Sequence, residues 1–89
     1  MTPREAVDIY KKNMRKNFEI NFLYDSKNYF TFYTEKDAIG TGIRIPSYYV
    51  NKNTGGLIDG FKPSPEMLLA STEHHDEGWK DPIPESEYS

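Results

Sequence analysis

The chain has 89 residues, of which 36% are hydrophobic and 28% are charged, and its formal net charge is -3. This length accommodates one small domain and leaves no room for two independent hydrophobic cores. The absence of cysteine excludes disulfides and thiolate-ligated metals, so the stability of the fold has to come from packing.

Aromatic and charged side chains divide the chain into two unequal parts. Aromatic residues make up 15% of a sequence whose mean hydropathy is only -0.81, and ten of the thirteen lie between Phe18 and Phe61. Residues 1–62 carry ten basic and seven acidic side chains, whereas residues 63–89 carry one basic and seven acidic ones. We therefore predict a single α+β domain over residues 1–72 and an acidic, flexible C-terminal tail over residues 73–89.

The sequence has no membrane-spanning or targeting pattern. No stretch approaches the roughly 18 to 20 apolar residues that a membrane span needs, and the first residues have the composition of a capped helix rather than of a signal peptide. We therefore expect a cytoplasmic protein without a membrane partner.

The opening residues, Thr2-Pro3-Arg4-Glu5, predict a helix N-terminus. Threonine suits the N-cap, proline suits the first helical position, and Glu5 is placed to accept a hydrogen bond from the backbone N–H of the cap residue. The apolar side chains that follow recur at helical spacing and predict one buried stripe, formed by Ala6, Val7, Tyr10 and Met14 with Ile9 beside it.

The opposite side of this helix carries a basic cluster formed by Lys11, Lys12, Arg15 and Lys16. Cations near a helix C-terminus interact favourably with the helix dipole by roughly a few tenths of a kcal/mol each, which gives the cluster a structural explanation. The cluster also supports an alternative function, because phosphates need cations and exposed rings can stack on bases. The strands carry no RNP-type motif and the acidic residues 63–89 would repel phosphate, so nucleic acid is the second hypothesis and not the first.

Two strands joined by a tight turn are predicted next. Apolar and polar side chains alternate over residues 18–24, which is typical of a half-buried strand. Residues 25–28 have the composition of a turn, and residues 29–34 form a second strand with large side chains on both faces. A β-hairpin is the simplest connection between the two strands.

A second hairpin is predicted further along the chain. Residues 43–50 indicate a third strand, in which Pro46 predicts an edge position, a bulge or a bend because proline cannot donate to a central ladder. Residues 51–56, with the sequence NKNTGG, form the clearest turn of the chain, and residues 57–61 form the returning strand.

A short helix is predicted after this hairpin. Ser64-Pro65-Glu66 repeats the capping pattern of the N-terminus, and residues 67–70 give the helix an apolar face with which it can dock on the sheet. After Thr72 the composition becomes polar and acidic, and Pro82 and Pro84 prevent regular structure.

Catalytic and nucleotide-binding patterns are weak. Gly40-Thr41-Gly42 lacks the third glycine and the lysine of a phosphate-binding loop, and we expect Glu35, Asp37 and Asp59 to be solvated loop acids rather than paired catalytic carboxylates. A thin sheet with one or two helices also has little volume for a water-excluding cleft. We therefore expect a protein that is not an enzyme and binds no cofactor.

His74-His75-Asp76-Glu77 is the one cluster of metal-competent side chains in the sequence. Adjacent histidines diverge by about 100° on a helix, so one rigid element does not easily direct both at a single metal. We therefore predict no metal site, and keep a metal-dependent enzyme centred on His74 and His75 as a third hypothesis.

The aromatic residues of the predicted sheet point instead to protein recognition. One sheet face packs under the first helix, and tyrosines exposed on the other face would be favoured interface anchors. The predicted partner-binding residues are Tyr29, Tyr33, Tyr48 and Tyr49. The alternative is that a second helix, or a second copy in a homo-oligomer, covers this face.

Two stretches of the chain resemble small bacterial domains. Residues 2–10, TPREAVDIY, resemble the opening helix of PepSY-like and small NTF2-like immunity domains, and residues 48–58, YYVNKNTGGLI, resemble their closing hairpin. These families place a helix before a curved antiparallel sheet and often show an Asp-Lys-x-Thr-Gly turn, where this chain has Asn51 in place of the aspartate. The resemblance, which covers residues 2–61, implies a non-catalytic binder that modulates a partner protein or neutralises a toxin, and it supplies no catalytic residues.

These patterns together predict an N-terminal helix, an antiparallel sheet of about four strands in two hairpins, and a short C-terminal helix. The function they favour is that of a small non-catalytic interaction or inhibitor module, of an immunity-like or accessory type found in bacteria or phages, with a protein partner.

Overall fold

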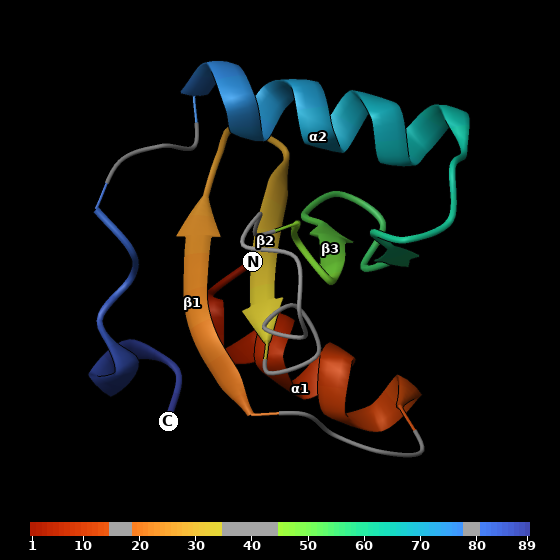
Figure 1. Ribbon diagram of the computed structural model, residues 1–89. Helices are drawn as coiled ribbons and strands as arrows, with labels where there is room; N and C mark the ends of the chain where they lie inside the picture. Colours follow the sequence, from red (N-terminus) through yellow and green to blue (C-terminus); the bar gives the residue numbers. More distant parts are fainter. Residues whose placement is uncertain (15–18, 35–44, 78–80) are drawn as a thin grey trace.

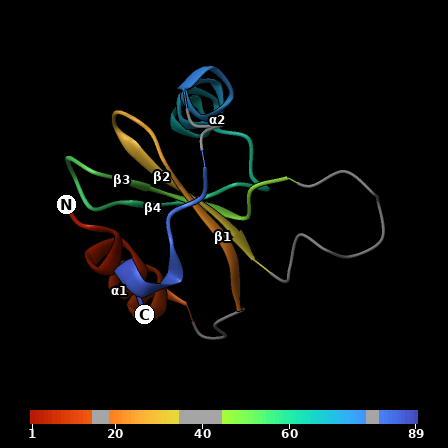
Figure 2. The same ribbon diagram turned by 90° about the vertical axis from the view of Figure 1, so that its left-hand side faces the viewer.

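The computed structural model describes residues 1–14, 19–34, 45–77 and 81–89, and consists of one antiparallel sheet between two helices (Figure 1). The strands lie in chain order, and α1 and α2 cover opposite faces of the sheet (Figure 2). The predicted α+β class, with two antiparallel hairpins between an early and a late helix, is confirmed. The elements are α1 (Pro3–Asn13), β1 (Ile20–Asp25), β2 (Tyr29–Thr34), β3 (Tyr48–Asn51), β4 (Leu57–Asp59), α2 (Pro65–Glu77) and the short 3-10 helix η2 (Glu85–Glu87).

Helix α1 begins where the capping pattern predicts. The Thr2 hydroxyl accepts a hydrogen bond from the Glu5 backbone N–H at 3.2 Å, and the Glu5 carboxylate accepts one from the Thr2 N–H at 3.0 Å. These reciprocal bonds satisfy N–H groups that a helix start otherwise leaves unpaired. The predicted stripe is confirmed: Ala6, Val7 and Tyr10 are buried, and Ile9 and Met14 are partly buried beside them.

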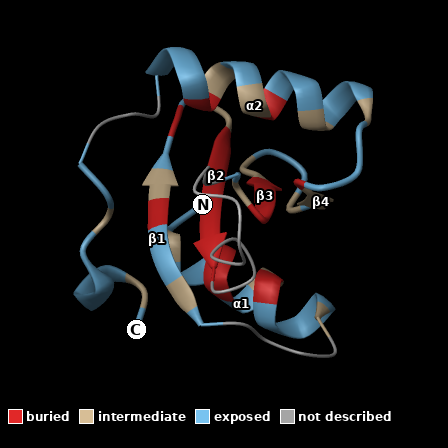
Figure 3. Cartoon of the chain, viewed as in Figure 1, coloured by how far each residue is buried: buried red, intermediate tan, exposed pale blue. Residues whose placement is uncertain are grey.

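Strand β2 runs through the middle of the molecule, and all six of its residues are buried (Figure 3). Successive side chains of a strand point to opposite faces, so β2 and β3 contribute to two separate clusters. Phe32 pairs with Tyr48 on the α1 side, and Thr31 pairs with Tyr49 on the α2 side. The α1-side cluster contains Ala6, Val7, Tyr10, Leu23, Phe30, Phe32, Tyr48 and Val50. The α2-side cluster contains Tyr29, Tyr49 and Ala70.

Strand β3 begins after Pro46, and it lies inside the sheet between β2 and β4. Of the three alternatives predicted for Pro46, the edge position is therefore wrong, and residues 43 and 44 of the predicted strand lie outside the described residues. The ladder starts one residue after the proline, where the Ser47 N–H donates to the Phe32 carbonyl at 2.8 Å, so the missing N–H of Pro46 interrupts no strand bond. Gly60 passes so close that a Cβ there would lie 2.1 Å from the Pro46 carbonyl oxygen, which requires glycine at this position.

The turn between β3 and β4 is the one that the sequence predicts. The Asn51 side-chain oxygen accepts hydrogen bonds from the backbone N–H groups of Asn53 and Thr54, at 2.8 and 3.1 Å. Gly55 has a φ of 73°, a conformation that other residues rarely adopt. Asparagine and glycine therefore occupy the positions whose backbone geometry needs them.

Helix α2 is longer than predicted. Its start is capped by Ser64, whose hydroxyl accepts a hydrogen bond from the Met67 N–H at 3.0 Å, and it continues to Glu77. The domain boundary predicted at residue 72 therefore lies inside a helix, and His74 is buried in the chain. The flexibility predicted for residues 73–89 stays a prediction.

Residues 81–89 return along β1 toward α1 (Figure 2). The Ile83 N–H donates to the Leu23 carbonyl at 2.8 Å, and the Arg4 guanidinium donates to the Ser89 carbonyl at 3.2 Å. No helix in the described parts of the chain has the length and hydropathy that a membrane crossing requires.

Candidate functional site

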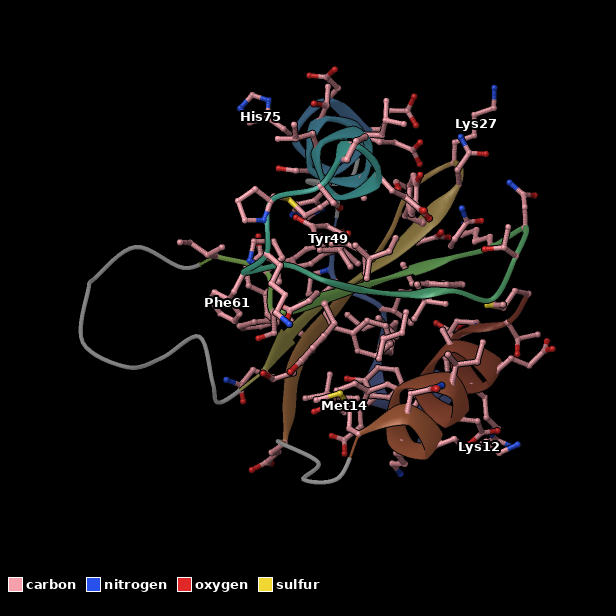
Figure 4. All side chains as sticks on the ribbon, turned by 90° about the vertical axis from the view of Figure 1, so that its right-hand side faces the viewer. Lys12, Met14, Lys27, Tyr49, Phe61 and His75 are labelled. Atoms are coloured by element: carbon pink, nitrogen blue, oxygen red, sulfur yellow. The ribbon has the colours of Figure 1, made fainter. Side chains whose placement is uncertain are left out.

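The four tyrosines predicted as a partner-binding surface do not form an exposed face. Tyr29, Tyr33, Tyr48 and Tyr49 retain only 2% to 7% of their accessible surface. Tyr48 belongs to the α1-side cluster, and the other three lie on the sheet face that α2 covers; Figure 4 shows Tyr49 between α2 and the sheet. The sequence left open whether a helix or a second copy covers the second face of the sheet. In the structure a helix of the same chain, α2, covers it, so no partner is needed to bury these rings.

Glu73 fastens α2 to the turn between β1 and β2. Its carboxylate accepts hydrogen bonds from the Ser26 hydroxyl at 2.7 Å, from the Asn28 backbone N–H, and from the Asn28 side-chain amide at 3.0 Å. Burial raises the pKa of Glu73, but the hydrogen bonds from Asn28 and Ser26 together outweigh it and hold this pKa below its usual value. The charged carboxylate therefore serves as a structural anchor of α2.

His74 gives α2 a second anchor on the same hairpin. Its Nε2 atom shares a hydrogen bond of 3.0 Å with the Tyr33 hydroxyl, and its ring lies 5.3 Å from the Tyr24 ring and 5.7 Å from the Tyr33 ring, between centroids. Burial lowers the pKa of His74, and the neighbouring His75 lowers it further. The neutral imidazole is therefore the form that this aromatic environment favours.

The outward side of α2 carries the most exposed large apolar side chains of the described residues. Leu68 is 60% exposed and Leu69 is 65% exposed. Thr72, His75 and Asp76 are exposed on the same helix, and Figure 4 shows His75 pointing away from the sheet. We call the exposed side of α2, with Leu68 and Leu69 as its apolar centre, the α2 outer face.

All full charges on α2 have the same sign. The helix contains Glu66, Glu73, Asp76 and Glu77 and has neither lysine nor arginine. Glu73 is engaged with the hairpin turn and Glu66 accepts a hydrogen bond from the Asn51 side-chain amide at 3.2 Å, but Glu66, Asp76 and Glu77 are all exposed on the helix that carries the apolar centre. The α2 outer face is therefore an apolar surface with an acidic border.

The predicted basic cluster is only partly described. Lys11 and Lys12 are exposed at the end of α1, and Figure 4 shows Lys12 pointing away from the sheet. Arg15 and Lys16 lie outside the described residues. The basic end of α1 and the acidic α2 thus lie on opposite sides of the sheet.

The two candidate metal-binding histidines, which the structure describes, do not converge. His74 is buried and His75 is exposed, so the two rings point in different directions from one helix. Within the described residues, no group of three or more potential metal ligands is found. The Asp59 carboxylate accepts a hydrogen bond from the Phe61 backbone N–H at 2.8 Å, as a turn-stabilising acid does, and Glu35 and Asp37 lie outside the described residues.

The sequence held a signal for the α2 outer face. Four consecutive apolar residues, 67–70, cannot all share one side of a helix, because successive positions differ by about 100°. Met67 and Ala70 face the sheet, so Leu68 and Leu69 have to point outward. The prediction that residues 67–70 form one apolar face on the sheet is therefore wrong for Leu68 and Leu69.

The comparisons with known proteins add no assignment. No family model, no curated protein sequence and no solved structure matches this chain.

Proposed function

We propose that this chain is a small non-catalytic protein-interaction module that binds its partner through the α2 outer face. The observation that carries the proposal is the exposure of two adjacent leucines on a helix that is already anchored to its own sheet by Glu73 and His74. A helix with exposed apolar side chains is suited to an apolar groove on a partner. An inhibitory, immunity-like role in the cytoplasm is the specific form that the sequence resemblance favours.

Charge selects the kind of partner. Leu68 and Leu69 lie on a helix that carries only acidic full charges, so a matching surface has an apolar groove flanked by lysine or arginine. A second copy fits poorly, because pairing two α2 outer faces would bring Glu66, Asp76 and Glu77 against the same residues of the other copy. The proposed occupant is therefore a basic surface of a different protein.

The test is affinity capture from a lysate of the source organism with three immobilised proteins: the wild type, Leu68→Ala/Leu69→Ala, and Ile45→Ala. Alanine keeps the helix propensity of α2, and Ile45 is a matched control because it is also an exposed apolar residue but lies outside α2. A partner of the α2 outer face should be recovered about tenfold less by the double variant, equally by the control, and less as salt is raised.

A second pair of variants separates charge from apolar contact. Glu66→Gln/Asp76→Asn should weaken capture at low salt and have little effect at high salt, where these charges are screened. Equal recovery by the wild type and the leucine variant would rule out the α2 outer face. Concentration-dependent dimers of the wild type that the leucine variant abolishes would assign the face to a second copy instead.

Nucleic-acid binding is the alternative proposal, and the exposure of Lys11 and Lys12 on the side of the sheet away from α2 favours it. It predicts retention on DNA or RNA that falls as salt increases and is lost when Lys11, Lys12, Arg15 and Lys16 are neutralised. The absence of retention at low salt would eliminate it.

A further inference from the structure

Residues 81–89 lie along an open edge of the sheet. Strand order places β1 at this edge, and among the described residues no strand pairs with its outward side. The Ile83 N–H donates to the Leu23 carbonyl across this edge. In the part of the chain that the structure describes, this is the one backbone hydrogen bond that the segment makes to β1 before it turns into η2 (Glu85–Glu87), so it forms no regular ladder.

Two side chains hold the segment in place. Ile83 and Tyr88 are partly buried and pack against the α1-side cluster, whereas the rest of residues 81–89 is exposed. Burial raises the pKa of the Tyr88 hydroxyl, with a further contribution from Glu85. The segment thus behaves as a short peptide with one apolar anchor and, five positions later, an aromatic one.

The segment does not fill the space in which it lies. Beside Tyr88, a hollow of about 400 Å³ is lined by Val7 and Tyr10 of α1 and Ile20 of β1. Near Ile83, another hollow of about 710 Å³ extends between Pro3 and the end of β1 at Asp25. We call this concave region along the β1 edge, bounded by α1, the α1–β1 groove.

We propose that the α1–β1 groove is a peptide-binding site and that residues 81–89 of the chain itself occupy it. An extended segment of a partner protein, with an apolar and an aromatic residue spaced like Ile83 and Tyr88, displaces residues 81–89 and binds in their place. Such a segment adds a strand to β1, with side chains in the positions of Ile83 and Tyr88. A segment that stays extended past the position of Pro84 can form further hydrogen bonds to the strand edge, whereas residues 81–89 turn into η2 (Glu85–Glu87). This site does not include Leu68 or Leu69 and does not depend on the function proposed for the α2 outer face, although Glu77 at the end of α2 lines the hollow near Ile83.

The test uses the whole chain with its own segment loosened. Ile83→Ser/Tyr88→Ser removes both anchors, and Ser86→Ala is the matched control because Ser86 is exposed within the same segment. The probe is a fluorescent nine-residue peptide with the sequence of residues 81–89, measured by fluorescence anisotropy. It should bind the double variant at least tenfold more tightly than the wild type or the control, since the tethered segment competes at a high effective concentration.

Two altered peptides test the proposed contacts. A peptide with Pro82→Val and Pro84→Val should bind more tightly than the native sequence, because valine favours the extended conformation that pairing with β1 requires. A peptide with Ile83→Ser and Tyr88→Ser should not bind. Failure of every peptide to bind a folded double variant would overturn the proposal, and dimerisation of that variant without peptide binding would assign the groove to a second copy.

If the double variant does not fold, hydrogen exchange and NMR of the wild type test the proposal instead. In the wild type, the Ile83 amide should exchange with solvent much faster than the amides of β2, because a replaceable segment opens without global unfolding. Adding the valine peptide should then shift the NMR signals of Leu23 and Val7. Exchange of Ile83 as slow as that of β2, without such shifts, would show a permanently fixed segment and overturn the proposal.

Discussion

The two faces of the sheet are covered by helices that attach in different ways. Helix α1 attaches through Ala6, Val7 and Tyr10, which pack on the phenylalanines of β2 in the larger apolar cluster. Helix α2 buries Ala70 against a smaller cluster and relies on Glu73 and His74 for its polar contacts with the first hairpin. One helix is therefore held mainly by apolar burial, and the other by a few directional hydrogen bonds.

The difference bears on function as well as stability. Apolar burial is proportional to area and tolerates small shifts, whereas hydrogen bonds fix an orientation and are costly to leave unmade. Glu73 and His74 help to fix the orientation of α2. Leu68 and Leu69 therefore point outward although they are not packed in an apolar pocket. The weaker apolar attachment of α2 thus accompanies the role that we propose for its outer face, which is to bind a partner.

The largest expected effect lies on the α1 face. Phe32→Ala removes a fully buried ring from the larger cluster and should lower the free energy of unfolding by about 3–5 kcal/mol in urea titrations. Phe22→Ala is the matched control, since Phe22 is 38% exposed on β1 and should cost much less. Comparable losses for the two variants would break the assignment of the main core to the α1 side.

An intermediate effect is expected where α2 meets the hairpin turn. Glu73→Gln keeps the shape of the side chain but replaces one oxygen by an NH₂ group that faces donors, and should cost about 1–3 kcal/mol. Glu77→Gln, at an exposed position on the same helix, should have little effect. Urea titrations of the two variants at neutral pH give the comparison.

The Glu73 contribution also has a defined pH dependence. Its pKa is lower in the folded chain than in the unfolded one, so its stabilisation is fully present above the unfolded pKa of about 4.5 and is lost as pH falls through the folded value. The stability difference between the wild type and Glu73→Gln should therefore shrink on acidification below about pH 4.5. A difference that stays constant down to pH 2 would show that charge plays no part in this anchor.

Local chemistry explains why α1, β2 and the turn at residues 51–56 could be predicted closely. The capping box at Thr2 and Glu5 acts within one helical turn, and the asparagine and glycine of the turn act within six residues. The run of aromatic and β-branched residues likewise placed β2 at residues 29–34, as observed. Each of these signals is contained in a short stretch of sequence.

The second layer could not be predicted in the same way. Glu73 contacts Asn28 across 45 positions of the chain, and His74 contacts Tyr33 across 41, so no local pattern announces either anchor. Without them, residues 73–77 have the composition of a solvated tail. The tyrosines of the α2 side then appear available to a partner, although α2 buries them. The predicted end of the helix near residue 72 and the predicted exposure of the tyrosines are thus both wrong because the contacts of Glu73 and His74 are distant in sequence.

The smallest expected effect concerns the protonation of His74. It sharpens the contrast between the two helices because the buried residues of α1, which are Ala6, Val7 and Tyr10, include no histidine. The pKa of His74 is lower in the folded chain than in the unfolded one. The resulting stabilisation is therefore present above the unfolded pKa of about 6.5 and is lost as pH falls from there toward the folded value. In thermal unfolding of the wild type, Tm should fall between about pH 7 and pH 5. The accompanying loss in the free energy of unfolding is about 1.4 kcal/mol for each pH unit that separates the folded and unfolded pKa values of His74.

His74→Gln should remove this part of the pH dependence, whatever its own stability, because glutamine does not titrate. His75→Gln should retain it, since His75 is exposed and only adds to the effect of burial on its neighbour. The groups around the ring from the packed elements are Tyr24 of β1 and Tyr33 of β2, and neither carries a negative charge near neutral pH that would favour the imidazolium. A Tm profile that is the same for the wild type and His74→Gln would show that α2 tolerates a charged His74. The orientation of its outer face would then rest on Glu73, on the Glu66–Asn51 hydrogen bond and on the packing of Met67 and Ala70.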